Sequence, residues 1–339
     1  MTETLKALCE LNGTSGREEK IREYIISRIH GLCEYRVDPM GNLICFKKGI
    51  NEPKNKVMLT AHMDEVGFII TYITDDGYLQ FDTVGGIDEK VIIGRNVFVG
   101  ENNIDGVIGI KAIHLCSGDE RTTVPTVDKM YIDIGASTKE EAEKYVSIGD
   151  CAYFSSDFED FCGNKVKAKA IDDRFGCSCL IKMLESELLF DGYFVFLVQE
   201  EVGLRGAGPA AFSVEPDYAI VLEATTAADV AGVSGASCVC KLGEGAVVSF
   251  MDRATVYNKN MFKRAFEIAK EKNIPCQTKT VVAGGNDAGT IHLSNGGIYT
   301  ITISLPCRYI HSGASIADKN DMNSCYKLAC ALLEEYANA

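Results

Sequence analysis

The sequence predicts an α/β protein in which a small all-β unit interrupts the main domain, and three features point to this fold class. After residue 165, apolar strand-like runs alternate with helical segments, which is typical of an α/β sheet. Between residues 65 and 164, short apolar runs instead alternate with Gly, Asp and Asn turns, a pattern typical of small barrels. The 339 residues also exceed the roughly 250–300 at which one hydrophobic core stops growing. We therefore expect an α/β domain from 1–64 and 165–339, with a β-barrel inserted at 65–164.

The first part of the main domain begins with a predicted helix. In GREEKIREYIISRIHGL (16–32), the residues Ile21, Ile25 and Ile29 recur at helical spacing, and two glutamates favour the first turn. A turn and a strand follow at 38–48. The segment 56–74 is rich in β-branched and aromatic residues and predicts two successive strands.

The inserted segment predicts strands almost throughout. Its short apolar runs are GYLQF, NVFVG, DGVIGIKAI, MYIDIG and CAYF. One helical patch interrupts them at 137–146, where Ser137 or Thr138 can cap the helix and glutamates lie in its first turn.

The remaining main-domain segment alternates between the two kinds of element. The predicted helices lie at 171–188, 258–273, 287–294 and 320–337, and the predicted strands lie at 192–200, 217–225, 278–282 and 297–305. In the last helix, Met322, Tyr326, Ala329 and Leu333 share one face.

Charge and composition limit the classes of partner. The net charge of −14 argues against nucleic acid, which rewards clustered Lys and Arg, and against anionic membrane surfaces. No uninterrupted apolar run reaches the roughly 18 residues of a membrane helix, and the first residues lack the pattern of a signal peptide. The fourteen cysteines contain no C-x2-C pair, which favours reduced thiols over disulfides or metal ligands. We therefore expect a cytoplasmic protein without nucleic-acid or membrane partners.

Polar side chains follow several apolar runs at the point where each predicted strand ends. VMLTAHMDE ends in His62 and Asp64, two positions that share one face of a strand. The other groups are Asp172 and Asp173 after AKAI, Glu200 and Glu201 after FVFLVQ, Glu223 after AIVL, and His311 after ISLPCRYI. Ligands of open α/β sheets gather outside the strand ends, so we expect these groups to lie close together.

Two histidines with several carboxylates suit two divalent metal ions of zinc-like character. Imidazole binds zinc well, and carboxylates bridge and neutralise a pair of cations. Such ions lie about 3.5–4 Å apart, lower the pKa of a shared water and polarise a carbonyl. A metal site would explain why Glu200 and Glu201 are adjacent, because one can ligate metal while its neighbour serves as general base. Asp64 can accept the second ring N–H of a metal-bound His62.

Each of these groups has a plainer interpretation when taken alone. A Glu-Glu pair usually lies in solvent, and a single histidine at a strand end is more often structural. The pair at Glu200 and Glu201 ends a strongly apolar run, however. The conjunction of five strand-end groups favours a functional site.

Eight segments together resemble the co-catalytic metallo-aminopeptidases of the M42 family, the tetrahedral (TET) aminopeptidases that include bacterial glutamyl aminopeptidases. In chain order they are DPMGNL, AHMDEVGF, AIDDRFGC, QEEVGLRGA, EATTAAD, MDRATV, GGNDAGTIH and RYIHS, and they run from residue 38 to 312. The resemblance implies a phosphorylase/hydrolase-like α/β catalytic domain with a β-barrel insertion used in dimerisation. It also implies removal of N-terminal amino acids from short peptides, by dimers or by twelve-subunit tetrahedral particles.

Carried over position by position, the resemblance implies two divalent ions per subunit. His62 and Glu223 would hold one ion, Glu201 and His311 would hold the other, and Asp172 would bridge them. Glu200 would be the general base and Asp64 the partner of His62. Zinc and cobalt suit this set best, and manganese also fits. The family often has Asp where this chain has Glu223, which puts the position or affinity of one metal in doubt.

Three further residues are candidates for substrate contacts. Arg253, in FMDRATVYNK, lies in a segment that resembles glutamyl-specific members, and a guanidinium pairs readily with an acidic side chain. The resemblance thus adds a preference for N-terminal Glu or Asp, with an ion pair between Arg253 and Asp252 or another acid as the alternative. Asp287 and Arg308 either contact the substrate or brace its site.

Rival functions stay open at this point. A related dinuclear deacylase or a carboxypeptidase-like amidohydrolase would use the same ligands on blocked substrates. A glycoside hydrolase also uses paired carboxylates, but it needs no pair of histidines, and the chain has no Trp to form a sugar platform. A non-catalytic shell protein is the third alternative, against which the complete set of ligands argues.

Overall fold

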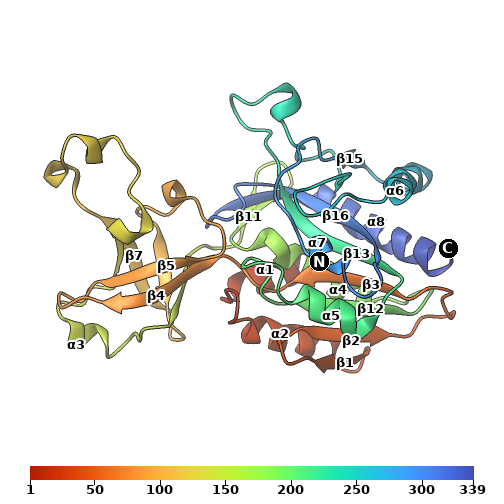
Figure 1. Cartoon of the computed structure of the whole chain (residues 1–339), viewed down its shortest axis with the longest axis horizontal. Coiled ribbons are helices and arrows are strands. Elements are labelled where there is room, and N and C mark those ends of the chain that lie inside the picture. Colours follow the sequence, from red (N-terminus) through yellow and green to blue (C-terminus); the bar gives the residue numbers. More distant parts are fainter.

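The computed structural model describes residues 1–339 and shows a closed β-barrel beside a larger α/β body (Figure 1). The barrel lies at the left of Figure 1, and both chain ends lie in the body at the right. The body is built around a mixed sheet of eleven strands. The predicted fold class, an α/β domain with an inserted β-barrel, is confirmed.

The large sheet has a parallel centre with antiparallel strands on both sides. Its strands are β1 (Glu34–Val37), β2 (Leu43–Lys47), β3 (Val57–His62), β10 (Glu159–Phe161), β11 (Lys165–Ala168), β12 (Gly192–Leu197), β13 (Tyr218–Thr226), β14 (Ala246–Val248), β15 (Cys276–Thr278), β16 (Tyr299–Arg308) and β17 (Ser315–Asp318). The order is β1-β2-β12-β3-β13-β16-β17-β11-β10. Off this path, β14 pairs with β16, and β15 pairs with β14. The neighbours β12, β3, β13 and β16 are parallel, so their carboxyl ends meet at one edge.

Helices cover both faces of this sheet. They are α1 (Thr2–Glu10), α2 (Glu19–Ile29), α4 (Ile171–Glu185), α5 (Ala207–Val214), α6 (Lys259–Glu271), α7 (Ala288–Ile291) and α8 (Lys319–Ala337). Alternate residues of a strand point to opposite faces. Phe194 and Phe196 therefore pack in the large core with α1, α2, α4, α6 and α8, whereas Val195 and Leu197 pack with α5 and α7.

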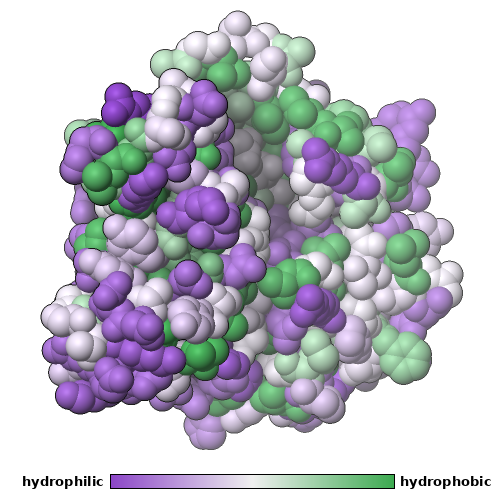
Figure 2. All heavy atoms as spheres, turned by 60° about the vertical axis from the view of Figure 1, so that its left-hand side comes forward, coloured by the Kyte–Doolittle hydropathy of each residue, from purple (hydrophilic) through white to green (hydrophobic).

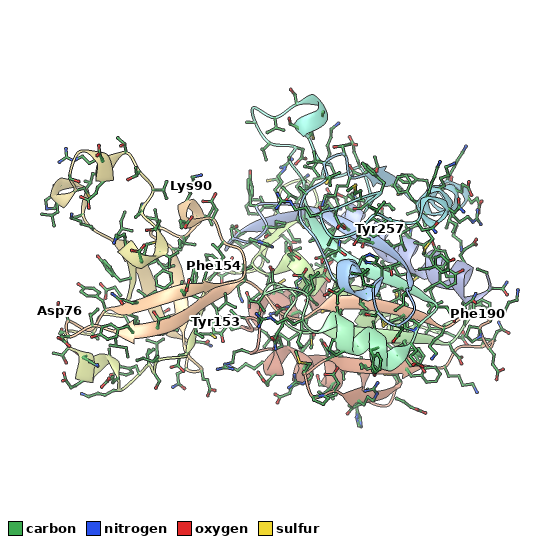
Figure 3. The ribbon with its side chains drawn as sticks, viewed as in Figure 1. Asp76, Lys90, Tyr153, Phe154, Phe190 and Tyr257 are labelled. Carbon is green, nitrogen blue, oxygen red and sulfur yellow. The ribbon has the colours of Figure 1, made fainter.

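The barrel has its own hydrophobic core. Its strands are β4 (Gly67–Ile73), β5 (Leu79–Val84), β6 (Asn96–Val99), β7 (Ile104–Ile110), β8 (Met130–Asp133) and β9 (Cys151–Phe154), closed in the order β4-β5-β8-β7-β6-β9, with the short helix α3 (Lys139–Ala142) between β8 and β9. Sixteen buried residues form the core, in which Phe68 meets Phe81 and Phe154 edge to face at 5.2 Å. Figure 3 shows Asp76 at the far tip of the barrel and Phe154 at the end near the body.

Several elements differ from the sequence prediction. The last barrel strand ends at Phe154, and β10, within the predicted insertion 65–164, pairs with β11 of the large sheet. β15 ends at Thr278, so the predicted strand at 278–282 is wrong beyond its first residue. The helices α1 and α5 are absent from the prediction, because α1 has no side-chain cap and the alanine-rich α5 shows little apolar periodicity.

Two general features of the chain complete the fold. All fourteen cysteines are free thiols, and most of them are buried. None of the helices combines the length and apolar character that crossing a membrane requires.

Candidate active site

The strand-end residues meet at the carboxyl edge of the parallel strands. His62 is the last residue of β3, and the pairing register places it opposite Leu197, so Glu200 and Glu201 follow three and four residues beyond that level. Glu223 lies inside β13, because that strand continues to Thr226. The register pairs Val221 with Thr60, so Glu223 comes level with His62.

Asp172 lies between the two histidines. Its Oδ1 is 3.3 Å from Nε2 of His62, and its Oδ2 is 3.5 Å from Nε2 of His311. Asp172 comes from the non-helical start of α4, whereas His311 lies in the loop between β16 and β17. Each oxygen of one carboxylate therefore faces a different imidazole.

The other ring nitrogen of each histidine is held by an acceptor. Nδ1 of His311 lies 2.7 Å from the backbone oxygen of Gly86, in the segment that follows β5. Nδ1 of His62 lies 3.1 Å from the backbone oxygen of Asp64 and 3.4 Å from its Oδ1. An Nδ1–H that donates in this way leaves Nε2 free as a ligand atom and orients the ring. Gly86 was not anticipated, because no local sequence signal marks a backbone oxygen as a partner.

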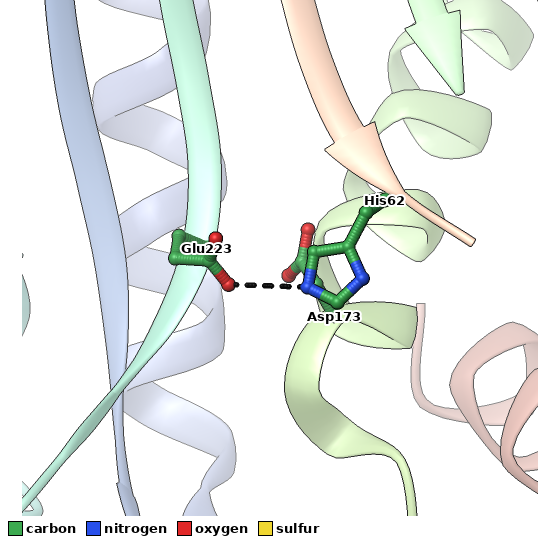
Figure 4. Close-up of side chains that lie close together, drawn as sticks. All are labelled: His62, Asp173 and Glu223. Carbon is green, nitrogen blue, oxygen red and sulfur yellow. Dashed lines mark ion pairs between the residues drawn. The ribbon is translucent and has the colours of Figure 1, made fainter. Parts of the chain in front are cut away.

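Each histidine also has its own glutamate. Oε1 of Glu223 is 3.5 Å from Nε2 of His62, and Oε2 of Glu201 is 3.3 Å from Nε2 of His311. Glu223 and His62 face each other across the site in Figure 4. These two pairs are the ones that the family resemblance implies for two separate metals.

Asp173 is a site residue that the sequence analysis left without a role. It groups with His62 and Glu223 at distances suited to one ion, and Figure 4 shows it at the start of α4 beside His62. Its Oδ1 accepts the N–H of Gly176, but its Oδ2 is buried and has no hydrogen-bond partner. The available signal was its place directly after Asp172.

Asp64 holds the glutamate pair through the backbone. Its Oδ1 accepts the N–H of Glu200 at 3.0 Å, and its Oδ2 accepts the N–H of Glu201 at 3.1 Å and the hydroxyl of Ser15 at 2.6 Å. Glu18 adds a similar contact, since its Oε1 accepts the N–H of Gln199 at 3.1 Å. The N-terminal segment, which carried no prediction of function, thus fixes the turn that presents Glu200.

The protonation equilibria reflect burial and crowding of like charges. Burial raises the pKa of Glu201 to about 8, against the lowering effect of His311. Burial also raises the pKa of Glu200 well above its usual range, and His62 opposes this rise. For His311, burial acts to lower the pKa, but Asp172 and Glu201 raise it to about 9. In the metal-free protein, these groups therefore compete for protons.

This donor set fits divalent cations. Buried charges in proteins are normally paired or bind metal, yet the carboxylates of Asp172, Asp173, Glu201 and Glu223 converge here with only two imidazoles among them. Cations would supply the missing charge, and they would give the unpartnered Oδ2 of Asp173 a counter-charge nearby. Imidazole nitrogen and carboxylate oxygen are ligands of zinc, cobalt and manganese alike.

A cavity of about 170 Å³ opens beside these residues. Its walls carry Asp172, Glu200, Glu201, Glu223, Ala224, Thr225, Thr226, Val239, Lys279, Ala283, Gly284, Gly285, Ile310 and His311. The space-filling view shows the molecule deeply hollowed on one face, with hydrophilic residues inside the hollow (Figure 2). The cavity is smaller than the roughly 300–1,000 Å³ of pockets for drug-sized ligands, so it suits a group of the size of one amino acid.

The three candidate substrate residues lie outside the walls of this cavity. The side chain of Arg253 is exposed. Arg308 forms a two-pronged ion pair with Asp229, with both N–O distances at 2.7 Å. Asp287 is buried at the start of α7, where burial raises its pKa to about 7. Its charge also contributes to the raised pKa of Glu200.

Comparison with known proteins gives the class of this chain, an aminopeptidase and thus a hydrolase of peptides, and also its family. The family model described as M42 glutamyl aminopeptidase matches residues 41–328. A putative aminopeptidase from Acetivibrio thermocellus is 42% identical, with 97% of each chain covered. A lysyl aminopeptidase from Pyrococcus furiosus is 34% identical over 98% of this chain and 96% of its own. The chain therefore belongs to the M42 family of aminopeptidases.

A solved structure supports the same assignment. The TET1 peptidase of Pyrococcus horikoshii, which can assemble into a tetrahedron or a large octahedral shell, superposes with a TM-score of 0.85. It is 37% identical over 97% of this chain and 98% of its own length. The family that the sequence motifs resemble is thus confirmed.

Proposed function

We propose that the protein removes single amino acids from the N-termini of short peptides, with two divalent ions bound in each subunit. The position of Asp172 carries this proposal, since its two oxygens face the Nε2 atoms of His62 and His311. His62 and Glu223 would hold one ion, Glu201 and His311 the other, and Asp172 would bridge them. Asp173 lies close enough to His62 and Glu223 to stabilise the first ion.

When bound, the ions would lower the pKa of a water molecule and polarise the scissile carbonyl. Glu200 lines the same cavity as Asp172, Glu201, Glu223 and His311 and is the general base of the proposal. Its carboxylate takes a proton from the water as the oxygen adds to the carbonyl carbon. The same proton then passes to the departing amine as the C–N bond breaks.

The N-terminal residue of the substrate would occupy the cavity. Its small volume favours one residue over an internal stretch of peptide. The carboxylates Glu200, Glu201 and Glu223 at the metal end would attract a free α-ammonium group. An N-acetylated peptide lacks that charge, so it would be a poor substrate.

Family membership leaves the residue preference and the assembly open. The family model is described as glutamyl, whereas the relative from Pyrococcus furiosus is a lysyl aminopeptidase. We propose a preference for N-terminal Glu or Asp. We also propose self-assembly as a dimer through the barrel, and assembly of such dimers into a tetrahedral dodecamer. Cytoplasmic location stays a prediction from the sequence.

The test is hydrolysis of the p-nitroanilides of Glu, Asp, Leu and Lys by protein stripped with a chelator and reloaded with zinc, cobalt or manganese. The proposal expects cleavage only after reloading, with Glu or Asp ahead of Leu. Cleavage led by Leu would remove the acidic preference and leave the aminopeptidase in place. Failure to cleave any anilide with any metal would refute the proposed activity.

A further inference from the structure

Lys279 is the only Lys or Arg among the residues that line the cavity. It directly follows β15, and its backbone N–H donates to the carbonyl of Val248 on the neighbouring strand β14. This contact fixes the start of the side chain at the edge of the sheet. The lining of the cavity therefore includes several carboxylate residues and one lysine.

The ammonium group of Lys279 is only partly partnered. Its Nζ donates one hydrogen bond, of 2.7 Å, to the backbone oxygen of Ala283. An ammonium group has three donors, so two remain for another acceptor. No carboxylate lies within 4.0 Å of Nζ, whereas Arg308 has a carboxylate oxygen of Asp229 at 2.7 Å.

An ammonium group without an anion is costly in this setting. Lys279 is half-buried, and burial lowers its pKa against the opposing charges of Asp252, Cys240 and Glu223. Burial of a charge is costly unless the charge is paired, so a half-buried ammonium group without a carboxylate partner favours an anion that arrives with a ligand. The remaining walls near it, Val239, Ala283, Gly284 and Gly285, carry no charge of their own.

We propose that Lys279 binds the side-chain carboxylate of an N-terminal Glu or Asp and so sets the acidic preference of the enzyme. The ligand chemistry is a carboxylate held by a lysine ammonium in a small cavity. This inference rests on the proposed aminopeptidase activity. It replaces Arg253 in the role of the acid-binding residue, because Arg253 does not line the cavity.

The test compares the p-nitroanilides of Glu and Gln, whose side chains match in length and differ in charge. The ratio of their kcat/KM values does not depend on metal loading or on the active fraction, because both cancel. The ratio is measured in the wild type and in Lys279→Met, which keeps the length of the side chain without its charge. A charge-assisted hydrogen bond in a half-buried site predicts a fall in the Glu:Gln ratio of about ten- to a hundred-fold. The kcat/KM for Leu-p-nitroanilide should fall by a smaller factor than that for Glu-p-nitroanilide, since Leu lacks the carboxylate that this hydrogen bond needs.

Two further variants separate the charge of Lys279 from general effects. Lys279→Arg restores a cation and should keep the ratio above that of Lys279→Met. Lys241→Met removes a lysine that pairs with Glu244 on the surface and lies outside the cavity, so it should leave the ratio unchanged. A ratio that falls in Arg253→Met and stays constant in Lys279→Met would overturn the proposal.

A second source of a carboxylate is the C-terminus of a dipeptide, and its arm of the test uses Leu-Gly and Leu-glycinamide. If Lys279→Met slowed only Leu-Gly and left the Glu:Gln ratio constant, the C-terminal carboxylate would be the ligand and the proposal would be wrong. Inhibition of the wild type by free glutamate and by glutamine needs no variant. Tighter inhibition by glutamate is expected, and equal inhibition would overturn the proposal.

The outcomes also separate this inference from the proposed function. A wild type that cleaves Leu-p-nitroanilide without preferring Glu over Gln would remove the role of Lys279 and leave the aminopeptidase standing. A wild type that cleaves none of the anilides would refute both.

Discussion

Replacement of Asp64 by Asn should disrupt the turn that presents Glu200 and Glu201. The carboxylate of Asp64 accepts two backbone N–H groups, at 3.0 and 3.1 Å, and the hydroxyl of Ser15 at 2.6 Å. An Asn amide has the same shape but only one oxygen acceptor. Its NH2 group would therefore face at least one of these N–H or O–H donors and leave that donor without an acceptor. Asp64→Asn therefore tests a contact network with almost no change in volume.

The magnitude follows from the number of bonds lost. One hydrogen bond to a charged group is worth about 1.5–3 kcal/mol, and one buried donor left without a partner costs about 1–3 kcal/mol. The free energy of unfolding should therefore fall by about 2.5–6 kcal/mol. Metal affinity should fall as well, because removal of the group that supports a metal-bound histidine typically costs about 10–100-fold.

The assay is urea unfolding of the metal-free protein, together with titration of the refolded variant with zinc. Asp76→Asn, at the exposed tip of the barrel, is the matched control and should change neither quantity (Figure 3). A loss below about 1 kcal/mol in Asp64→Asn, with unchanged metal affinity, would refute the role given to this carboxylate.

Three more changes test other parts of the site. Glu200→Gln should keep the bound metal and lower kcat by about 10²–10⁴-fold through loss of the general base, and near wild-type kcat would disprove that assignment. Metal affinity should rise with pH up to about 9, because His311 and Glu201, with pKa values of about 9 and about 8, must lose protons to bind metal. Calorimetry in two buffers should therefore show proton release on binding. Binding that does not depend on pH would contradict this prediction. Gly176→Ala places a Cβ 2.3 Å from Oδ2 of Asp173, so it should lower the free energy of unfolding by about 1–3 kcal/mol and reduce the metal content. Gly296→Ala is the control: its Cβ meets open space, and it should change neither stability nor metal content.

The fold class and the clustering of the strand-end residues could be predicted from the sequence because they rest on local patterns. His62 and Asp64 stand two residues apart at the end of an apolar strand, and Glu200 and Glu201 end another. The barrel was readable from short strands separated by turns. The family motifs then joined these separate signals into one site.

Other features depend on contacts between distant segments and leave no local signal. The backbone oxygen of Gly86 supports His311 across 225 residues of sequence, and Ser15 reaches Asp64 across 49. Lys279 enters the cavity only because β15 joins the large sheet beside β14. The helix α5 could not be predicted from the sequence, because small apolar residues make up most of it and no polar face contrasts with the buried face.

Two metal ions at this site should support cleavage of unblocked peptides from the N-terminus. The most direct measurement titrates metal-free protein with zinc or cobalt and records bound metal and hydrolysis of Glu-p-nitroanilide and its N-acetylated form in parallel. Activity should rise until two ions are bound per subunit, and the acetylated substrate should stay intact. Full activity with one ion, or faster cleavage of the acetylated substrate, would contradict this prediction.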